Sequence, residues 1–74
     1  MTRSWNKMTY DKDGACWVVY LGGRSYTLHC GECIEIRIGD KGIPCRIELD
    51  RDWYVIMREA RFNLRKKETY QVDI

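Results

Sequence analysis

The sequence predicts an all-β fold, a small SH3-like barrel of five to six short antiparallel strands with a charged excursion before the last strand. Three observations lead to this prediction. Apolar and polar residues alternate along several short runs. Glycine and aspartate turn signals separate these runs at spacings of about 8–12 residues. The chain has 74 residues, which are few for two full sheets, and closing one sheet removes its exposed edges. An open, strongly bent antiparallel sheet is the alternative.

The first third of the chain predicts a hairpin. A run over residues 15–21 follows the turn dipeptide Asp13-Gly14 and is rich in valine and aromatic residues. Gly22-Gly23 then separates it from a second run over residues 24–28. Two glycines can both adopt positive φ, so they predict a tight turn. In the second run Tyr26 and Leu28 share one face. Residues 5–10 are a further candidate strand.

The middle of the chain predicts two half-buried strands. In residues 33–38 the isoleucines lie on one face and Cys33 lies on the other with charged residues. A turn over residues 39–42 leads into residues 43–49, where Cys45 shares the apolar face with isoleucine and leucine. Pro44 in this second run indicates an edge or the start of a strand, because proline has no N–H to donate.

The last third predicts two more strands around the charged excursion. Residues 53–57 and 69–74 alternate between apolar and polar side chains. Residues 58–68 are mostly charged, and their two large apolar side chains, Phe62 and Leu64, are two positions apart. This stretch is either a helical turn or a charged excursion that anchors both side chains to the core.

Length and charge limit the class of protein. We expect residues 1–74 to form one domain. The net charge is +2, from 13 lysines and arginines against 11 aspartates and glutamates, which is no strong nucleic-acid signature.

The first residues lack the apolar run of a signal peptide, and no stretch has the roughly 18 apolar residues of a membrane span. We therefore expect a cytoplasmic protein with reduced cysteines, no membrane contact, no cofactor and no enzymatic activity.

The spacing of His29, Cys30 and Cys33 raises the possibility of a structural zinc site. A structural zinc site needs four ligands, usually as two close pairs. Only Cys30 and Cys33 form such a pair, whereas Cys16 and Cys45 lie singly within predicted strands. A zinc-stapled module is therefore a less favoured alternative.

The sequence evidence for redox or nucleophilic chemistry at these cysteines is weaker than the evidence for zinc. A redox dithiol precedes a helix, but a β-branched alternating run follows Cys33. Free cysteine is among the most buried residue types. The favoured interpretation is structural. Leu28 and Cys30 point inward, His29 points outward, and Gly31-Glu32 bend the chain and turn the glutamate side chain to solvent.

A further set of residues resembles a known family. The residues are Leu28-His29-Cys30-Gly31-Glu32, Glu35, Arg46-Ile47-Glu48, Trp53-Tyr54, Leu64 and Val72. Together they resemble a family of short bacterial proteins, mostly from Gram-positive species, that is catalogued as a domain of unknown function. The resemblance covers about residues 14–74 and implies a small β-barrel without assigned activity. Asp73 departs from the basic residue expected near the end.

The candidate binding surface is the basic stretch 58–67. It comprises Arg58, Arg61, Arg65, Lys66, Lys67 and the nearby Tyr54. Cations follow phosphates and aromatic rings stack on bases, so a weak nucleic-acid site is one interpretation. A solvated charged loop is the other, because Glu59 and Glu68 dilute the charge.

The tryptophans leave a similar choice. Trp5, Trp17 and Trp53 could line a peptide groove, or they could fill a small core, which the size of their rings favours. The sequence assigns no function. The favoured prediction is a non-enzymatic interaction or accessory module that binds an unknown protein partner. Weak nucleic-acid binding through residues 58–67 is the alternative.

Overall fold

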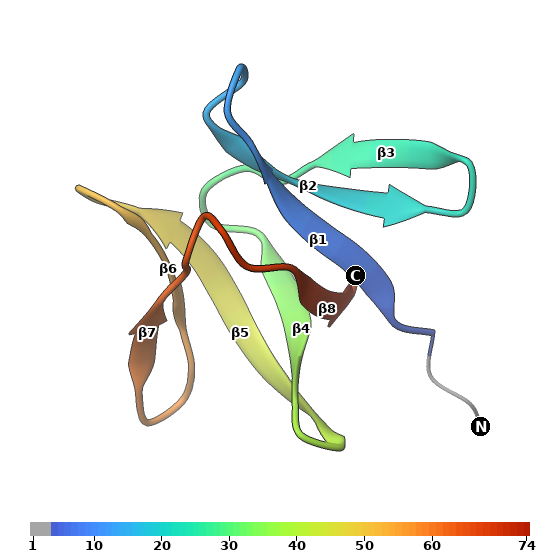
Figure 1. Ribbon diagram of the computed structural model, residues 1–74. Coiled ribbons are helices and arrows are strands. Elements are labelled where there is room, and N and C mark those ends of the chain that lie inside the picture. Colours follow the sequence, from blue (N-terminus) through green and yellow to red (C-terminus); the bar gives the residue numbers. More distant parts are fainter. Residues whose placement is uncertain (1–3) are drawn as a thin grey trace.

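A computed structural model describes residues 4–74 as one antiparallel sheet of eight strands (Figure 1). The strands are β1 (Asn6–Asp11), β2 (Cys16–Leu21), β3 (Arg24–Thr27), β4 (Cys33–Ile38), β5 (Lys41–Leu49), β6 (Trp53–Ile56), β7 (Arg61–Asn63) and β8 (Tyr70–Asp73). The all-β prediction is confirmed. Residues 4–74 contain no helix that is long and apolar enough to cross a membrane.

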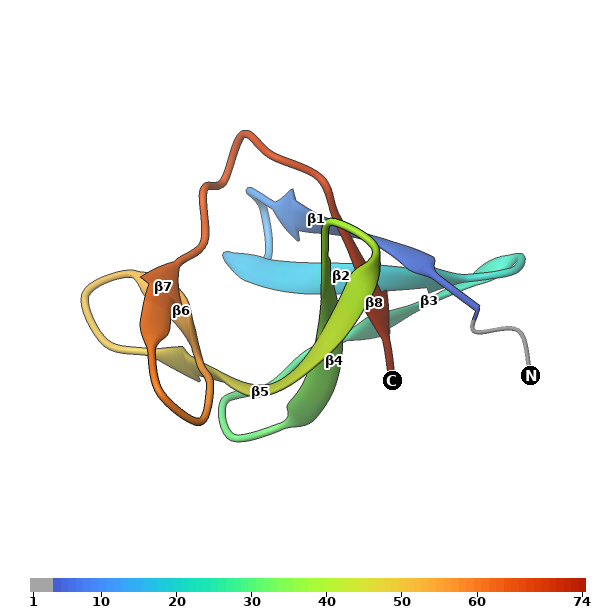
Figure 2. The same cartoon turned by 90° about the horizontal axis from the view of Figure 1, so that it is seen from below.

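The sheet is built as two wings joined by its last strand. The order across the sheet is β3-β2-β1-β8-β4-β5-β6-β7. We call β1, β2 and β3 the first wing and β4 to β7 the second wing. Strand β8 pairs with β1 on one side and with β4 on the other. Figures 1 and 2 show the two wings bent towards each other rather than lying in one plane.

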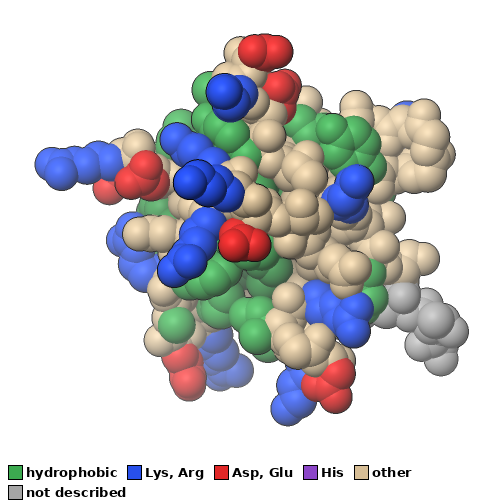
Figure 3. All heavy atoms as spheres, in the orientation of Figure 1, with side chains coloured by type: hydrophobic (Ala, Val, Ile, Leu, Met, Phe, Trp, Pro, Cys, Tyr) green, Lys and Arg blue, Asp and Glu red, His purple; other side chains and the backbone are tan. Residues whose placement is uncertain are grey.

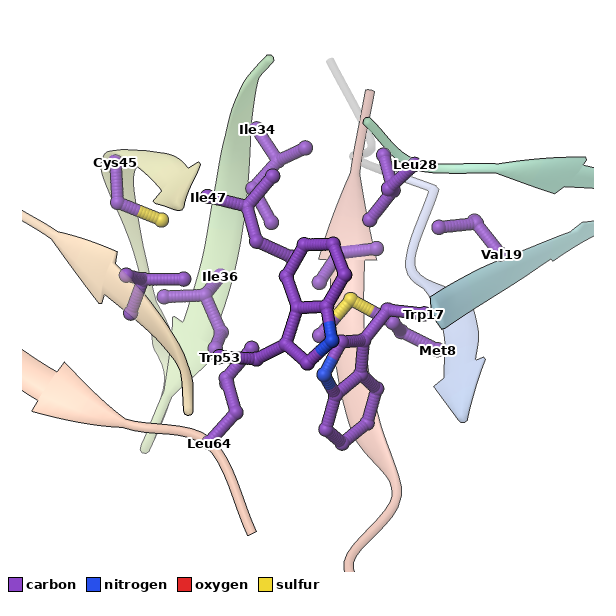
Figure 4. Packing of buried hydrophobic residues seen from close by; sticks show 12 residues of the cluster. Met8, Trp17, Val19, Leu28, Ile34, Ile36, Cys45, Ile47, Trp53 and Leu64 are labelled. Carbon is purple, nitrogen blue, oxygen red and sulfur yellow. The ribbon is translucent and has the colours of Figure 1, made fainter. Parts of the chain in front are cut away.

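The core lies between the wings. Its buried residues come from both of them and from the segments next to them: Met8, Trp17, Val19, Leu28, Ile34, Ile36, Cys45, Ile47, Trp53, Val55, Leu64 and Val72. In Figure 4, Trp17 from the first wing and Trp53 from the second point into this one cluster. Trp17 and Trp53 therefore fill the core and line no groove, while Trp5 is half-buried.

The sheet differs from the predicted barrel in two respects. It has more strands than the five to six expected, and it is not closed, because β3 and β7 end the strand order without pairing with each other. Both of these strands are short and their residues are exposed. The observed structure is the alternative, an open and strongly bent antiparallel sheet.

The predicted strands and turns are otherwise found close to their expected places. Gly22 and Gly23 have φ angles of 46° and 91°, as the predicted tight hairpin between β2 and β3 requires. The candidate strand near the N-terminus is β1. The excursion over residues 58–68 is no helix and contains the short strand β7, with Leu64 buried just after it. Phe62 is exposed on β7, so the expectation that both side chains are anchored to the core holds for Leu64 but is wrong for Phe62.

Candidate functional site

The segment from Leu28 to Glu32 is the corner that connects the two wings. The Glu32 N–H donates to the His29 carbonyl at 3.2 Å, and Gly31 has a φ of 91°. This is a tight turn whose third residue must adopt positive φ. The second half of the turn is bonded to β5 at Ile47: the Gly31 N–H donates to the Ile47 carbonyl at 2.8 Å, and the Ile47 N–H donates to the Glu32 carbonyl at 2.9 Å. The predicted turn at Gly31 is confirmed.

The Glu32 side chain holds this corner together. Its carboxylate accepts hydrogen bonds from the Tyr26 hydroxyl and the His29 N–H, and the His29 Nδ1 lies 3.3 Å away. Partial burial raises the pKa of Glu32, but these bonds outweigh it, and the pKa lies below its ordinary value of 4.5. The bond to Glu32 raises the pKa of Tyr26 above 10.0. The Glu32 carboxylate lies at the surface, as predicted, but it folds back onto the turn instead of extending into solvent.

The four cysteines do not converge. Cys45 is buried, Cys16 is half-buried, and Cys30 and Cys33 are exposed. The prediction that Cys30 points inward is wrong, because Cys30 occupies the second position of the exposed turn. Burial raises the pKa of the Cys45 thiol from 9.0 to about 11. Within residues 4–74, no three histidine, cysteine or acidic side chains lie close enough together to hold a metal ion.

The predicted basic surface is divided among three places. Arg61 lies on β7 with its guanidinium carbon 4.0 Å from the centre of the Tyr54 ring. Arg58 lies in the β6–β7 turn. The remaining three cations lie in the loop between β7 and β8. The structure therefore brings Arg61 and Tyr54 together, but it does not gather all the predicted residues on one patch.

The loop between β7 and β8 carries the densest charge. Arg65, Lys66 and Lys67 line a shallow hollow of about 410 Å³ together with Asp52 and Glu68. Figure 3 shows lysine and arginine side chains interspersed with carboxylates on this face. Lys66 lies over the Tyr10 ring at 5.1 Å.

A larger, apolar groove lies between β5 and the β6–β7 turn. It has a volume of about 560 Å³ and is lined by Ile43, Pro44, Met57, Arg58, Glu59 and Ala60. We call it the β5 groove. Sequence reasoning missed it, because Ile43 and Pro44 belong to a different hairpin from the other four residues. Of the predicted binding residues, only Arg58 reaches it.

The comparisons with known proteins identify a family but no activity. The family model described as a domain of unknown function, DUF5348, matches residues 6–74. A structural genomics protein from Ruminococcus gnavus with a crystal structure is similar to this chain at 26% sequence identity and a TM-score of 0.77. The similarity covers 96% of this chain and 100% of that one. No curated protein matches.

Proposed function

This chain belongs to the DUF5348 family of domains of unknown function, and we propose that it is a non-enzymatic interaction module that binds a protein partner in the β5 groove. The observation that carries the proposal is the groove itself. Its lining is predominantly apolar, and its volume of about 560 Å³ is in the range of sites that hold side chains or small ligands. Apolar surface that is gathered in a concave site is a common mark of an interaction site.

The groups whose pKa values are shifted have structural roles. Among the described residues the shifted groups are Tyr26, Glu32 and Cys45, and none of them lines the β5 groove. The first two serve the corner and the third lies in the core. The two exposed thiols fit a reducing compartment such as the cytoplasm.

Weak nucleic-acid binding through residues 58–67 is the second candidate. It is favoured by the exposed cations of the β7–β8 loop and by Arg61 stacked on Tyr54. Neighbouring carboxylates reduce the local charge, and the cations lie in three separate places. A complex that depends on phosphate contacts would weaken steeply as the salt concentration rises.

Affinity capture from native lysate tests the two candidates together. The bait is the wild-type chain, compared with Met57→Asp in the groove and with Leu49→Asp as the matched control. Leu49 lies at the other end of β5 and is already exposed. We expect a protein that is captured by the wild type and by Leu49→Asp, lost with Met57→Asp, and retained after nuclease treatment and at raised salt.

Two outcomes would contradict the proposal. Capture that is equal for Met57→Asp and Leu49→Asp would show that the groove does not bind the partner. Capture that disappears with nuclease or moderate salt would favour the second candidate. Thermal melts of both variants show whether each remains folded.

A further inference from the structure

We infer that the β5 groove receives an extended, apolar segment of the partner as an added strand paired with β5. This inference rests on the proposed function and specifies how the partner is recognised. It starts from the register of β5. Strand β4 pairs with β5 along residues 41–46, whereas β6 pairs with it only from Arg46 to Leu49. The first half of β5 therefore has a neighbouring strand on one side only.

The direction of the main-chain groups follows from one hydrogen bond. The Ile47 N–H donates to the Glu32 carbonyl, which lies on the β4 side. Main-chain groups of successive residues in a strand point to opposite sides. The main-chain groups of Ile43 and Cys45 therefore also face β4, and those of Gly42 and Pro44 face the open side of β5, where Pro44 lines the groove. An incoming strand meets the Gly42 N–H, the Gly42 carbonyl and the Pro44 carbonyl.

The space beside these groups is kept open by the β6–β7 hairpin. The Met57 N–H donates to the Ala60 carbonyl at 2.8 Å, so the chain turns back directly after β6. The β4–β5 turn and the β6–β7 turn lie apart in both Figure 1 and Figure 2. The β5 groove lies between Ile43 and Pro44 on one side and the residues from Met57 to Ala60 on the other.

The lining of the groove determines the chemistry of the added strand. Ile43, Pro44, Met57 and Ala60 provide apolar surface, and the two charged lining residues have opposite signs. Side chains of a strand alternate between its two faces. A partner segment with an apolar residue at every second position can fill the groove while its main chain pairs with β5, as in other cases of strand addition.

Pro44 favours a foreign strand over a second copy of this chain. Proline removes one donor from the edge of a strand, so pairing is weakest where both edges carry a proline. If two copies paired through this edge, each would lack that donor. A partner strand without proline loses only one bond. The limited number of main-chain bonds also makes the fit of side chains in the groove necessary.

The test uses linear peptides. A phage-displayed library of random linear peptides is selected on the wild-type chain, and the selected sequence is synthesised with single N-methyl groups at successive amides. An N-methyl group removes a donor and blocks pairing on that side of a strand. We expect affinity to fall at least about tenfold, or about 1.4 kcal/mol, at alternate positions. N-methylation at the positions between them should have little effect.

Gly42→Pro provides a second measurement on the protein side. It removes the donor on the open side of β5 while leaving the pairing with β4. Ser25→Pro is the matched control, because Ser25 lies on the edge strand β3 and its N–H faces away from β2 by the same alternation. We expect Gly42→Pro to weaken the selected peptide at least about tenfold and Ser25→Pro to leave its affinity unchanged, with thermal melts confirming that both fold.

The outcomes separate the two proposals. If Met57→Asp abolishes peptide binding but neither N-methylation nor Gly42→Pro weakens it, the groove binds side chains only. The inference is then overturned and the proposed function stands. If Met57→Asp has no effect either, both fail. If no peptide is selected and the wild type self-associates in a way that Gly42→Pro abolishes, the occupant is a second copy and the inference is wrong.

Discussion

At the scale of single residues, Gly31 has the most demanding backbone position in the corner between the wings. Its φ of 91° lies in a region that other residues rarely adopt. A Cβ placed there would meet no neighbouring atom within 4 Å. A substitution would therefore be unfavourable because of backbone strain alone and not because of a clash.

The stability effect of a substitution at Gly31 can be compared directly with that of a substitution at Cys33. Gly31→Val should lower the free energy of unfolding by about 1–3 kcal/mol, the cost of a strained backbone. Cys33→Ser should be nearly silent, because Cys33 is exposed on the outer face of β4. Thermal melts of the two variants, run side by side, measure both effects. The reverse order, with Cys33→Ser severe and Gly31→Val tolerated, would mean that Cys33 is a ligand.

Ionisation of Cys45 should lower the free energy of unfolding at alkaline pH. Its pKa is raised from 9.0 to about 11, so the folded state holds the proton more tightly than the unfolded chain does. This contribution is fully present below pH 9.0 and is lost as the pH rises through about 11. Between these values the wild type should lose about 2 kcal/mol more than Cys45→Val. Urea unfolding across this pH range measures the difference, and parallel pH profiles would refute it.

At the scale of elements, the β7–β8 loop runs from the outermost strand of the second wing to the strand that joins the two wings (Figure 2). Its start is fixed by Leu64, whose N–H donates to the Trp53 carbonyl at 2.9 Å. Its end is fixed by the Tyr70 hydroxyl, which accepts a hydrogen bond from the Arg65 N–H at 2.9 Å. The Tyr70 ring packs edge-to-face against Trp17 and Phe62. The loop is thus bound to the core from both ends.

Removing one hydroxyl tests this arrangement. Tyr70→Phe keeps the ring contacts and removes the acceptor of the Arg65 N–H, so stability should fall by about 1 kcal/mol. Tyr20→Phe is the control, because Tyr20 is an exposed tyrosine on β2. Hydrogen exchange at the Arg65 amide should accelerate in Tyr70→Phe alone. An unchanged exchange rate would show that the hydroxyl does not hold the loop.

The elements show where sequence reasoning succeeds and where it ends. Runs that alternate over several residues, such as those in β2, β4 and β5, are visible because burial of one face imposes a period of two. Strand β7 is too short to show a period, and of its three residues only Phe62 is apolar. The sequence also does not predict whether the sheet closes into a barrel, because a sequence pattern reports which face of a strand is buried but not whether the two outermost strands pair.

The candidate site was less predictable than the fold for the same reason. The turn at Gly31 has a local sequence signal, since glycine there serves the conformation of its own residue. The β5 groove has no local sequence signal. It forms where β6 stops pairing with β5 and the chain bends away into the β6–β7 turn. Arg61 and Tyr54 were expected on one surface and do lie in contact, but their meeting depends on a strand that the sequence did not reveal.

At the scale of the whole molecule, one core joins two wings in a chain of 74 residues. Domains of this size often depend on a disulfide or a metal ion. Here the wings are connected by the pairing of β8 with both of them, by the corner at Gly31 and by Trp17 and Trp53 in a shared cluster. We therefore expect this packing, and not a metal held by the cysteines, to stabilise the fold.

Thermal unfolding of natively purified protein with and without a strong chelator, combined with elemental analysis of the same sample, tests that claim most directly. We predict the same melting temperature in both conditions and zinc well below one equivalent per chain. Zinc at one equivalent per chain, together with unfolding when the chelator is added, would contradict the claim and make Cys30 and Cys33 metal ligands.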